Sequence, residues 1–209
     1  MLTRRDVLRL PLAIGTVAAV GTITALEGCA PPWTIIRQAT PNPLVGTRAF
    51  AILPISFEGV IIGGRSEEAY LSRRSDNQRA SYEADKQAMV TRLFERLAGN
   101  SAGLVLRPLD TAVMATVPVL VVRFVYIELG TNGGFGFGGA AASGRNSQTS
   151  LMLRIVSPDG TPIDEVELHA TRPSGSFSSS GARMRRLGDS AADVIFRYLR
   201  ERTQPPAAT

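Results

Sequence analysis

Ser101 is the residue whose surroundings most directly suggest chemistry. Residues 99–103 read Gly-Asn-Ser-Ala-Gly and match G-x-S-x-G, the pattern in which a sharp turn from a strand into a helix exposes a nucleophilic serine. The predicted order here is the reverse, since a helix is expected to end at Ala98 and a strand to begin at Leu104. The only available base, His169, is expected in the middle of a strand. We interpret residues 99–103 as a helix stop and a turn, and a serine hydrolase that uses Ser101 remains an alternative function.

Glycine spacing raises the question of a nucleotide cofactor. Gly134, Gly136 and Gly139 fit G-x-G-x-x-G, and Asp159 follows 20 residues later, where a ribose-binding acid would stand. No helix is predicted after these glycines, and Asp159 belongs to a predicted turn. We therefore expect no dinucleotide site and no cofactor.

Phe135 and Phe137 lie among those glycines, in a segment that spans residues 130–144. The segment is too rich in glycine to be a helix and is predicted to be a loop. Aromatic side chains on such a loop can insert into a partner, into a membrane or into their own domain. We predict that Phe135 and Phe137 contact a partner, and packing on their own domain is the alternative.

The remaining polar residues predict surface chemistry rather than a catalytic or metal site. Glu165 and Glu167 share one face of a predicted strand, but an exposed strand face normally carries such carboxylates. A chain with one histidine and one cysteine holds no multi-histidine metal site and no internal disulfide. The 23 basic and 18 acidic residues give a formal charge of +5 without a compact basic stripe. We expect no catalytic residues, no metal and no nucleic-acid partner.

The elements that must position these residues follow from periodicity and turn chemistry. Ser75 and Gln78 form a capping-box pattern ahead of a helix that ends at Ala98. The sequence Ser157-Pro158-Asp159-Gly160 favours a turn between two antiparallel strands. The strands are predicted at residues 48–56, 104–106, 117–129, 150–156 and 163–171, and the last helix at residues 183–202. This order predicts an α+β fold, with a mostly antiparallel sheet of about five strands and two main helices packed on one face.

Side-chain alternation predicts which faces are buried. In the first long helix, Met89, Leu93 and Leu97, flanked by Val90 and Phe94, mark an apolar face. In the strand at residues 163–171, alternation sends Val166, Leu168 and Ala170 inward and Glu165, Glu167 and His169 to the polar face. Asp164, next to Glu165, is interpreted as one more acidic surface residue.

The first 29 residues have the composition of an export signal. Arg4, Arg5 and Arg9 precede an uncharged apolar run, residues 10–26. This run of 17 residues is shorter than the roughly 20 that a bilayer span requires. The only cysteine, Cys29, follows at once.

The signal resembles those of bacterial lipoproteins. Leu26-Glu27-Gly28-Cys29 is similar to a lipobox, although Glu27 departs from the small residue usual at its position. The resemblance implies cleavage before Cys29, acylation of Cys29 and a membrane anchor, and Ala30 after the cysteine implies the outer membrane, facing the periplasm. Residues 3–9 resemble a twin-arginine export motif, and the general secretory route is the alternative.

The division of the chain follows from this signal. We expect a signal peptide at residues 1–28, a lipidated proline-rich tether at 29–46, one α+β domain at 47–204 and a tail at 205–209. Trp33 in the tether could rest at the membrane interface or pack on the domain.

The mature domain resembles small uncharacterised envelope lipoproteins, whose α/β domain is similar to those of curli-secretion-like and Tol-system periplasmic proteins. The residues that carry this resemblance are the strand 49–55, the helix to Ala98, the strand 151–156, the turn at Pro158-Asp159-Gly160 and the helix end at residues 197–200. It implies a membrane-anchored periplasmic lipoprotein that serves as a non-catalytic binding or assembly component of the envelope, with an envelope protein as partner. The alternatives are the Ser101 hydrolase and a carrier that holds a lipid or another apolar ligand between sheet and helices.

Overall fold

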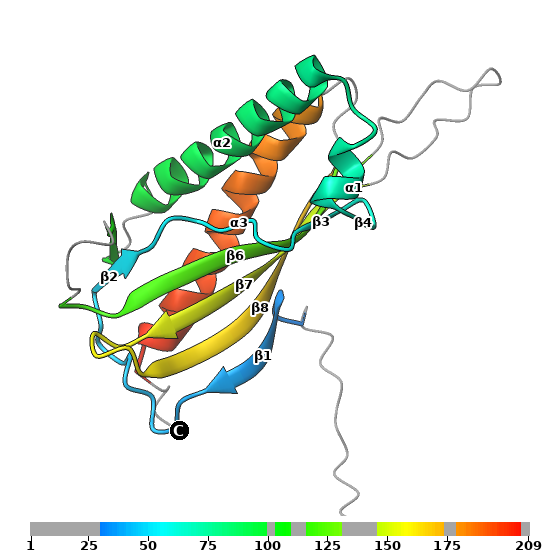
Figure 1. Cartoon of the computed structure of the whole chain (residues 1–209). Helices are drawn as coiled ribbons and strands as arrows, with labels where there is room; N and C mark the ends of the chain where they lie inside the picture. Colours follow the sequence, from blue (N-terminus) through cyan, green and yellow to red (C-terminus); the bar gives the residue numbers. More distant parts are fainter. Residues whose placement is uncertain (1–29, 100–102, 110–115, 131–145, 174–178, 206–209) are drawn as a thin grey trace, which may run out of the picture. The chain divides into compact units, whose positions relative to one another are not determined.

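The computed structural model describes residues 30–99, 103–109, 116–130, 146–173 and 179–205 (Figure 1). Pro31–Thr209 form one compact unit. Its helices are α1 (Glu67–Leu71), α2 (Asp76–Gly99) and α3 (Ser180–Thr203). Its strands are β1 (Trp33–Gln38), β2 (Ala49–Ile52), β3 (Ile61–Ile62), β4 (Arg65–Ser66), β5 (Val105–Pro108), β6 (Val119–Glu128), β7 (Ser147–Val156) and β8 (Pro162–Arg172).

The predicted fold class, a mostly antiparallel sheet of about five strands with two main helices, is wrong. Within the described residues the sheet has eight strands, in the order β1-β8-β7-β6-β2-β5, with β3 beside β6 and β4 beside β3. β1, β8, β7 and β6 are antiparallel neighbours, whereas β2 is parallel to both β6 and β5. The sheet is therefore mixed, and three helices accompany it.

The parallel pairing has a topological cause. Parallel neighbours need a long crossover connection, usually a helix, and α2 supplies one between β2 and β5. β2 and β3 each pair in parallel with β6 over two residues, with Ala51 of β2 opposite Val119 and Ile62 of β3 opposite Ile127. Local sequence patterns show neither pairing, because both join segments that are far apart in the chain.

The predicted tether at residues 29–46 also needs correction. Residues 33–38 form β1, which pairs with β8 from Trp33 opposite Leu168 to Gln38 opposite Asp164. Trp33 is 8% exposed and meets the ring of Tyr198 edge-on, with 5.5 Å between ring centroids. The four prolines of this region read as a linker, yet two of them precede the strand and two follow it, so they do not interrupt its pairing.

Several local predictions are confirmed. The backbone N–H of Ser75 donates to Gln78 Oε1 (3.1 Å) and the N–H of Gln78 donates to Ser75 Oγ (3.4 Å), so the capping box opens α2 as expected. β7 and β8 form the predicted hairpin around residues 157–160. Val166, Leu168 and Ala170 are buried, whereas the side chains of alternate residues lie on the other face.

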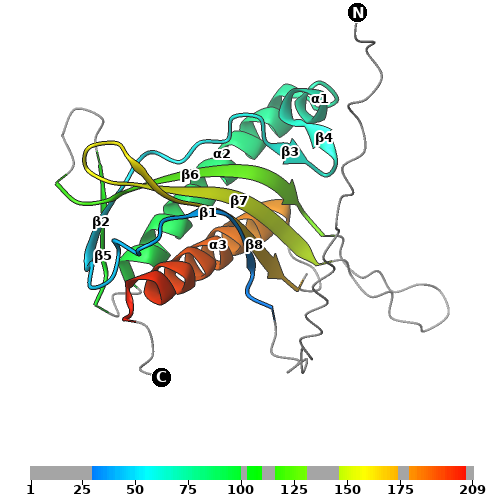
Figure 2. The same ribbon diagram turned by 90° about the horizontal axis from the view of Figure 1, so that it is seen from below.

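The core lies between the sheet and the two long helices (Figure 2). α3 packs on β7 and β8 and also along α2. Leu153 and Ile155 of β7 and Leu187, Ile195 and Leu199 of α3 are fully buried there. The opposite face of the sheet carries polar side chains. No helix within the described ranges combines the length and hydropathy that crossing a membrane would take.

Candidate functional site

Four residues singled out in the sequence lie outside the described residues. They are Cys29, the predicted lipidation site, Phe135 and Phe137, the predicted partner contacts, and Ser101, the nucleophile of the alternative hydrolase. The elements around Ser101 nevertheless have the predicted order. α2 ends at Gly99 and β5 begins at Val105, so the G-x-S-x-G pattern connects a helix to a strand. A nucleophile elbow requires the opposite order.

His169 lies on the face of the sheet that points away from α3, which we call the open face, in a pair with Ser150. The Ser150 hydroxyl is 3.0 Å from His169 Nδ1, and Glu167 Oε1 is 4.0 Å from the same nitrogen. A catalytic serine–histidine–carboxylate triad uses the two ring nitrogens separately, one for the serine and one for the acid. Because both partners here approach Nδ1, the three residues do not have the geometry of a triad.

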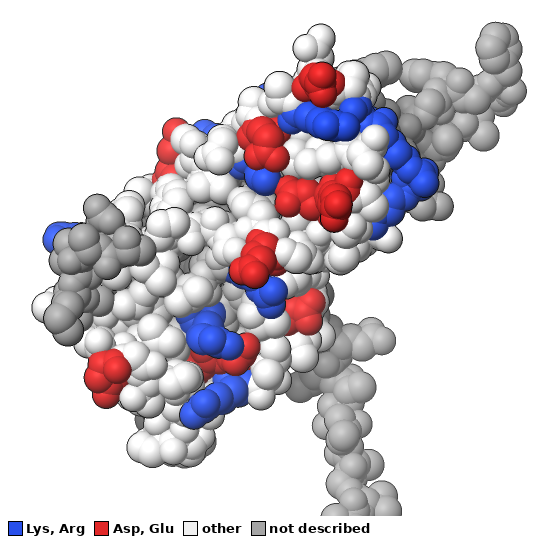
Figure 3. All heavy atoms as spheres, in the orientation of Figure 1, with Lys and Arg blue, Asp and Glu red and all other residues white. Residues whose placement is uncertain are grey.

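The open face carries both signs of charge (Figure 3). Glu165 pairs with Arg154 at 3.1 Å, and Glu128 accepts hydrogen bonds from Tyr126 (2.9 Å) and Gln148 (2.6 Å). These carboxylates are already paired across neighbouring strands. The face therefore has the character of a solvated sheet surface, as sequence analysis predicted for Glu165 and Glu167.

Asp159, the residue at the spacing of a ribose-binding acid, stabilises the β7–β8 turn. Its Oδ1 accepts hydrogen bonds from the Ser157 hydroxyl and from the backbone N–H of Thr161. The hydrogen bond from Ser157, followed by that from Thr161, holds the pKa of Asp159 below its ordinary value. The candidate glycines at 134, 136 and 139 lie outside the described residues.

Asp164 is the polar residue that sequence analysis placed wrongly, because it is fully buried rather than on the surface. Arg202 of α3 donates to both of its oxygens, at 2.7 and 3.0 Å, and the Tyr198 hydroxyl donates at 2.9 Å. The backbone N–H of Ala39 adds a fourth hydrogen bond at 3.2 Å. The cluster joins β8, α3 and the chain after β1, so its role is structural. Asp164 has the same parity in β8 as Val166 and Leu168, so alternation along the strand points it inward, and only its charge suggested the surface.

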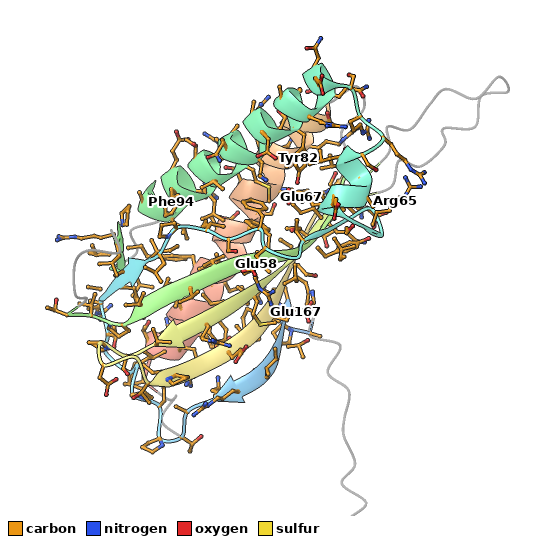
Figure 4. The ribbon with its side chains drawn as sticks, viewed as in Figure 1. Glu58, Arg65, Glu67, Tyr82, Phe94 and Glu167 are labelled. Atoms are coloured by element: carbon orange, nitrogen blue, oxygen red, sulfur yellow. The ribbon has the colours of Figure 1, made fainter. Side chains whose placement is uncertain are left out.

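A second polar cluster lies where α1 meets α2 (Figure 4). Glu67 Oε1 accepts hydrogen bonds from the Tyr82 hydroxyl (2.7 Å) and from Lys86 Nζ (2.9 Å). Lys86, the only lysine of the chain, also reaches Glu83 at 3.0 Å and lies 5.3 Å from the centroid of the Phe57 ring. A hollow of about 190 Å³ adjoins the cluster beside Tyr82.

The titration behaviour of the second cluster follows from its contacts. Burial and the hydrogen bond to Glu67 raise the pKa of Tyr82 far above its ordinary value. Burial alone would lower the pKa of Lys86, but the hydrogen bonds to Glu67 and Glu83 outweigh it and raise that pKa. Lys86 therefore stays charged at neutral pH and does not have the depressed pKa of a catalytic amine.

The strongest candidate site is an apolar groove of about 400 Å³ between α2 and the parallel edge of the sheet. We call it the α2 groove. Gln87, Val90 and Phe94 of α2 form one wall, and Ile52, Phe57 and Leu109 belong to the facing wall. The helix residues are spaced i, i+3 and i+7, which places them on one side of α2. In Figure 4, Phe94 lies toward the end of α2 that is farther from Tyr82.

Packing explains why the α2 groove is open. Met89, Leu93 and Leu97 are buried against α3 and the sheet, whereas Val90 and Phe94 beside them are only partly buried. Sequence analysis identified all five as an apolar face, but periodicity alone does not tell which of them meet other atoms of the domain. The groove can bind an apolar group by excluding water, and it offers no charged side chain for chemistry.

A metal centre finds no support in the described residues, since no group of three or more His, Cys, Asp or Glu side chains among them could hold an ion.

No protein-family model matches the chain, and no curated protein matches it. The chain is similar to a PelC dodecamer from Paraburkholderia phytofirmans, with 12% identity, 78% of this chain and 96% of that chain covered, and a TM-score of 0.32. It is also similar to an uncharacterised protein, with 13% identity, 79% and 95% covered, and a TM-score of 0.34. At these TM-scores the likeness carries no argument about fold or function.

Proposed function

We propose that this protein is a lipid-anchored periplasmic component of the cell envelope that has no catalysis of its own. Its α2 groove binds an apolar segment of another envelope protein. The observation that carries the binding proposal is the groove itself, an apolar hollow at the less tightly packed side of the domain. The resemblance of residues 1–29 to a lipoprotein signal supports the anchor and a location at the periplasmic side of the outer membrane, whichever export route the protein takes.

The chemistry of the α2 groove suits recognition. A binding site for an apolar group is typically concave, mostly hydrophobic and about 300–1,000 Å³ in volume. The groove has about 400 Å³, and Gln87 is the one side chain in its helix wall that could direct a hydrogen bond to a bound backbone. Phe57 is held in place by stacking on Phe124, with 5.0 Å between ring centroids, so that wall is pre-organised.

A carrier of an acyl chain is the second candidate, because the same lining would suit it. No Asp, Glu, Lys or Arg lines the α2 groove, so nothing in the wall would pair with a charged ligand. The two candidates differ in what occupies the groove. A protein partner would extend beyond the groove onto the surrounding surface of the domain, whereas an acyl chain would not.

Site-specific photo-crosslinking in the native envelope tests the proposal. A photoreactive amino acid replaces Val90 in the α2 groove, and a matched control replaces Ala84, an exposed residue of the same helix. We expect a discrete protein adduct from position 90, identified by mass spectrometry, and none from position 84. A lipid adduct at position 90 would favour the carrier. Equal, unspecific labelling from both positions would contradict a binding role for the groove.

Two further measurements test the rest of the proposal. Cys29→Ser should yield an unprocessed precursor without lipid, and normal processing with release of this variant from the membrane would refute lipidation.

A serine-reactive fluorophosphonate should not label the protein. Labelling that disappears in Ser101→Ala would replace the binding function with the hydrolase alternative.

A further inference from the structure

We propose that β1, the edge strand of the sheet, lies on the surface of the membrane that holds the anchor. Ile35 and Ile36 meet the boundary between headgroups and acyl chains, and Arg37 and Arg197 meet lipid phosphates. This inference rests on the proposed acylation of Cys29. It adds an orientation, because it specifies which side of the domain faces the bilayer.

The first argument is the length of chain between the anchor and the fold. Cys29 precedes Trp33 by four residues, and two of the three residues between them are proline. A proline-rich segment extends about 3.1 Å per residue, so the backbone of Trp33 lies within roughly 12–14 Å of that of Cys29. An acylated Cys29 therefore holds the start of β1 close to the headgroups.

Contacts of Trp33 with the domain limit how far the domain can lie from Cys29. Trp33 as a residue is 8% exposed, and its ring packs edge-on against Tyr198 with its centroid 5.7 Å from the guanidinium of Arg197. The backbone N–H of His169 also donates to the carbonyl of Pro32 at 2.8 Å. The chain is thus fixed to the domain from Pro32 onward, and no slack remains to let the domain move away from the membrane.

The second argument is the exposure of β1 itself. Ile35 and Ile36 are 51% and 55% exposed, and they are the only two adjacent residues among the large exposed hydrophobics of the described chain. A register shift between Ile35 and Arg37 leaves Ile36 without a partner in β8. A bulge of this kind re-aims side chains away from the regular pattern of the sheet. Two neighbouring isoleucines in water next to a lipid anchor are well placed to enter the interface.

The third argument is charge. Arg37 in β1 and Arg197 above Trp33 are both exposed, and cations close to an anionic lipid surface are attracted to its phosphates. Another strand is a poorer occupant of this edge, because the bulge interrupts the regular ladder that strand addition would extend. A lipid surface needs no regular hydrogen-bond register along β1.

Fluorescence quenching by lipid tests this orientation in the full-length, processed protein. Acylation consumes the thiol of Cys29, so an introduced cysteine is the only free thiol available for a fluorophore. The test variant is Ile36→Cys, and the matched control is Val105→Cys, which is 44% exposed on β5 at the other edge of the sheet. Both labelled proteins are reconstituted in vesicles of phosphatidylethanolamine and phosphatidylglycerol that contain a spin-labelled lipid.

We expect loss of fluorescence at position 36 and little or none at position 105. Adding Arg37→Glu to the position-36 variant should weaken the quenching, whereas Arg107→Glu, an exposed change on β5, should leave it unchanged. Equal quenching at positions 36 and 105 in a protein whose mass confirms acylation would overturn the orientation alone. A wild-type protein whose Cys29 reacts with the fluorophore is not acylated, and that result would overturn the anchor and the orientation together.

Discussion

α2 and α3 have the same length, 24 residues, but they cover the sheet in different ways. α3 buries eleven residues, including Gly181, Gly188, Ala191 and Ala192, whose small side chains let it approach its neighbours closely. α2 buries four, Tyr82, Met89, Leu93 and Leu97. The antiparallel half under α3 is therefore a framework (the framework half), whereas the parallel half beside α2 leaves the α2 groove open (the groove half).

Polar clusters repeat the contrast. In the framework half, Asp164 is fully buried and accepts hydrogen bonds from Arg202 and Tyr198. In the groove half, Glu67 accepts a hydrogen bond from Tyr82 and pairs with Lys86, but 28% of its side chain stays exposed. The first cluster has little access to water, so solvent cannot replace a lost partner there. The second lies near the surface, where the loss of one partner is partly compensated by solvent.

The largest expected effect is in the framework half. Asp164→Ala removes the carboxylate and leaves Arg202 and the Tyr198 hydroxyl without their buried acceptor. Breaking a buried ion pair from one side typically costs about 3–5 kcal/mol, which urea unfolding would measure. The control is Glu165→Ala, the neighbouring residue in an exposed pair with Arg154, with an expected cost of at most about 1 kcal/mol. Equal costs for the two variants would remove the distinction between the clusters.

Two neighbouring residues of α2 sharpen the comparison within one helix. Leu93 is fully buried, and Leu93→Ala should lower the free energy of unfolding by about 2–5 kcal/mol. Phe94 lines the α2 groove, so Phe94→Ala should cost clearly less although it removes a larger side chain. Phe94→Ala should also weaken the crosslink from position 90. Similar losses of stability in both variants would show that the groove wall is part of the core.

The spacing between α2 and α3 is tested at Gly188. A Cβ at this position would lie 2.3 Å from the backbone carbonyl oxygen of Met89, which cannot move aside as a side chain could. Gly188→Ala should therefore destabilise the domain by about 1–3 kcal/mol in chemical unfolding. Gly99→Ala at the end of α2 meets no atom within 4 Å and should be neutral or slightly stabilising, since alanine favours a helix. If both changes had the same sign, close helix packing would not be the cause.

The smallest expected effect concerns pH and compares one tyrosine from each half. Burial, together with Asp164 for Tyr198 and Glu67 for Tyr82, raises the pKa of both hydroxyls above 10.0. Above pH 10 the unfolded chain loses these protons while the folded chain keeps them. The stability that they contribute is therefore complete below pH 10 and is lost as the pH rises toward the folded-state pKa.

Tyr198→Phe and Tyr82→Phe should each lower the free energy of unfolding at pH 7 by about 1 kcal/mol, since each removes one hydrogen bond. Each should also flatten the fall in stability above pH 10, as followed by urea unfolding at several pH values. A slope that stays unchanged in Tyr198→Phe would mean that this hydroxyl ionises alike in the folded and unfolded chains.

Sequence patterns predicted the features whose causes are local. The capping box of Ser75 and Gln78, the apolar stripe of Met89, Leu93 and Leu97, and the hairpin around residues 157–160 all depend on residues a few positions apart. Patterns failed where distant segments meet. β1 lay in a segment with four prolines, and the parallel pairing of β2 with β5 depends on a crossover of more than 50 residues rather than on a turn.

The candidate site divides along the same line. The sequence by itself determined that Val90 and Phe94 are apolar and helical, that Cys29 follows an uncharged apolar run, and that Ser101 follows a helix rather than a strand. Only the tertiary structure decided that Val90 and Phe94 border a groove, that Asp164 meets Arg202 and Tyr198, and that Trp33 ties β1 to α3. Periodicity records which side chains avoid water, but whether another element fills the space beside them depends on how distant elements pack.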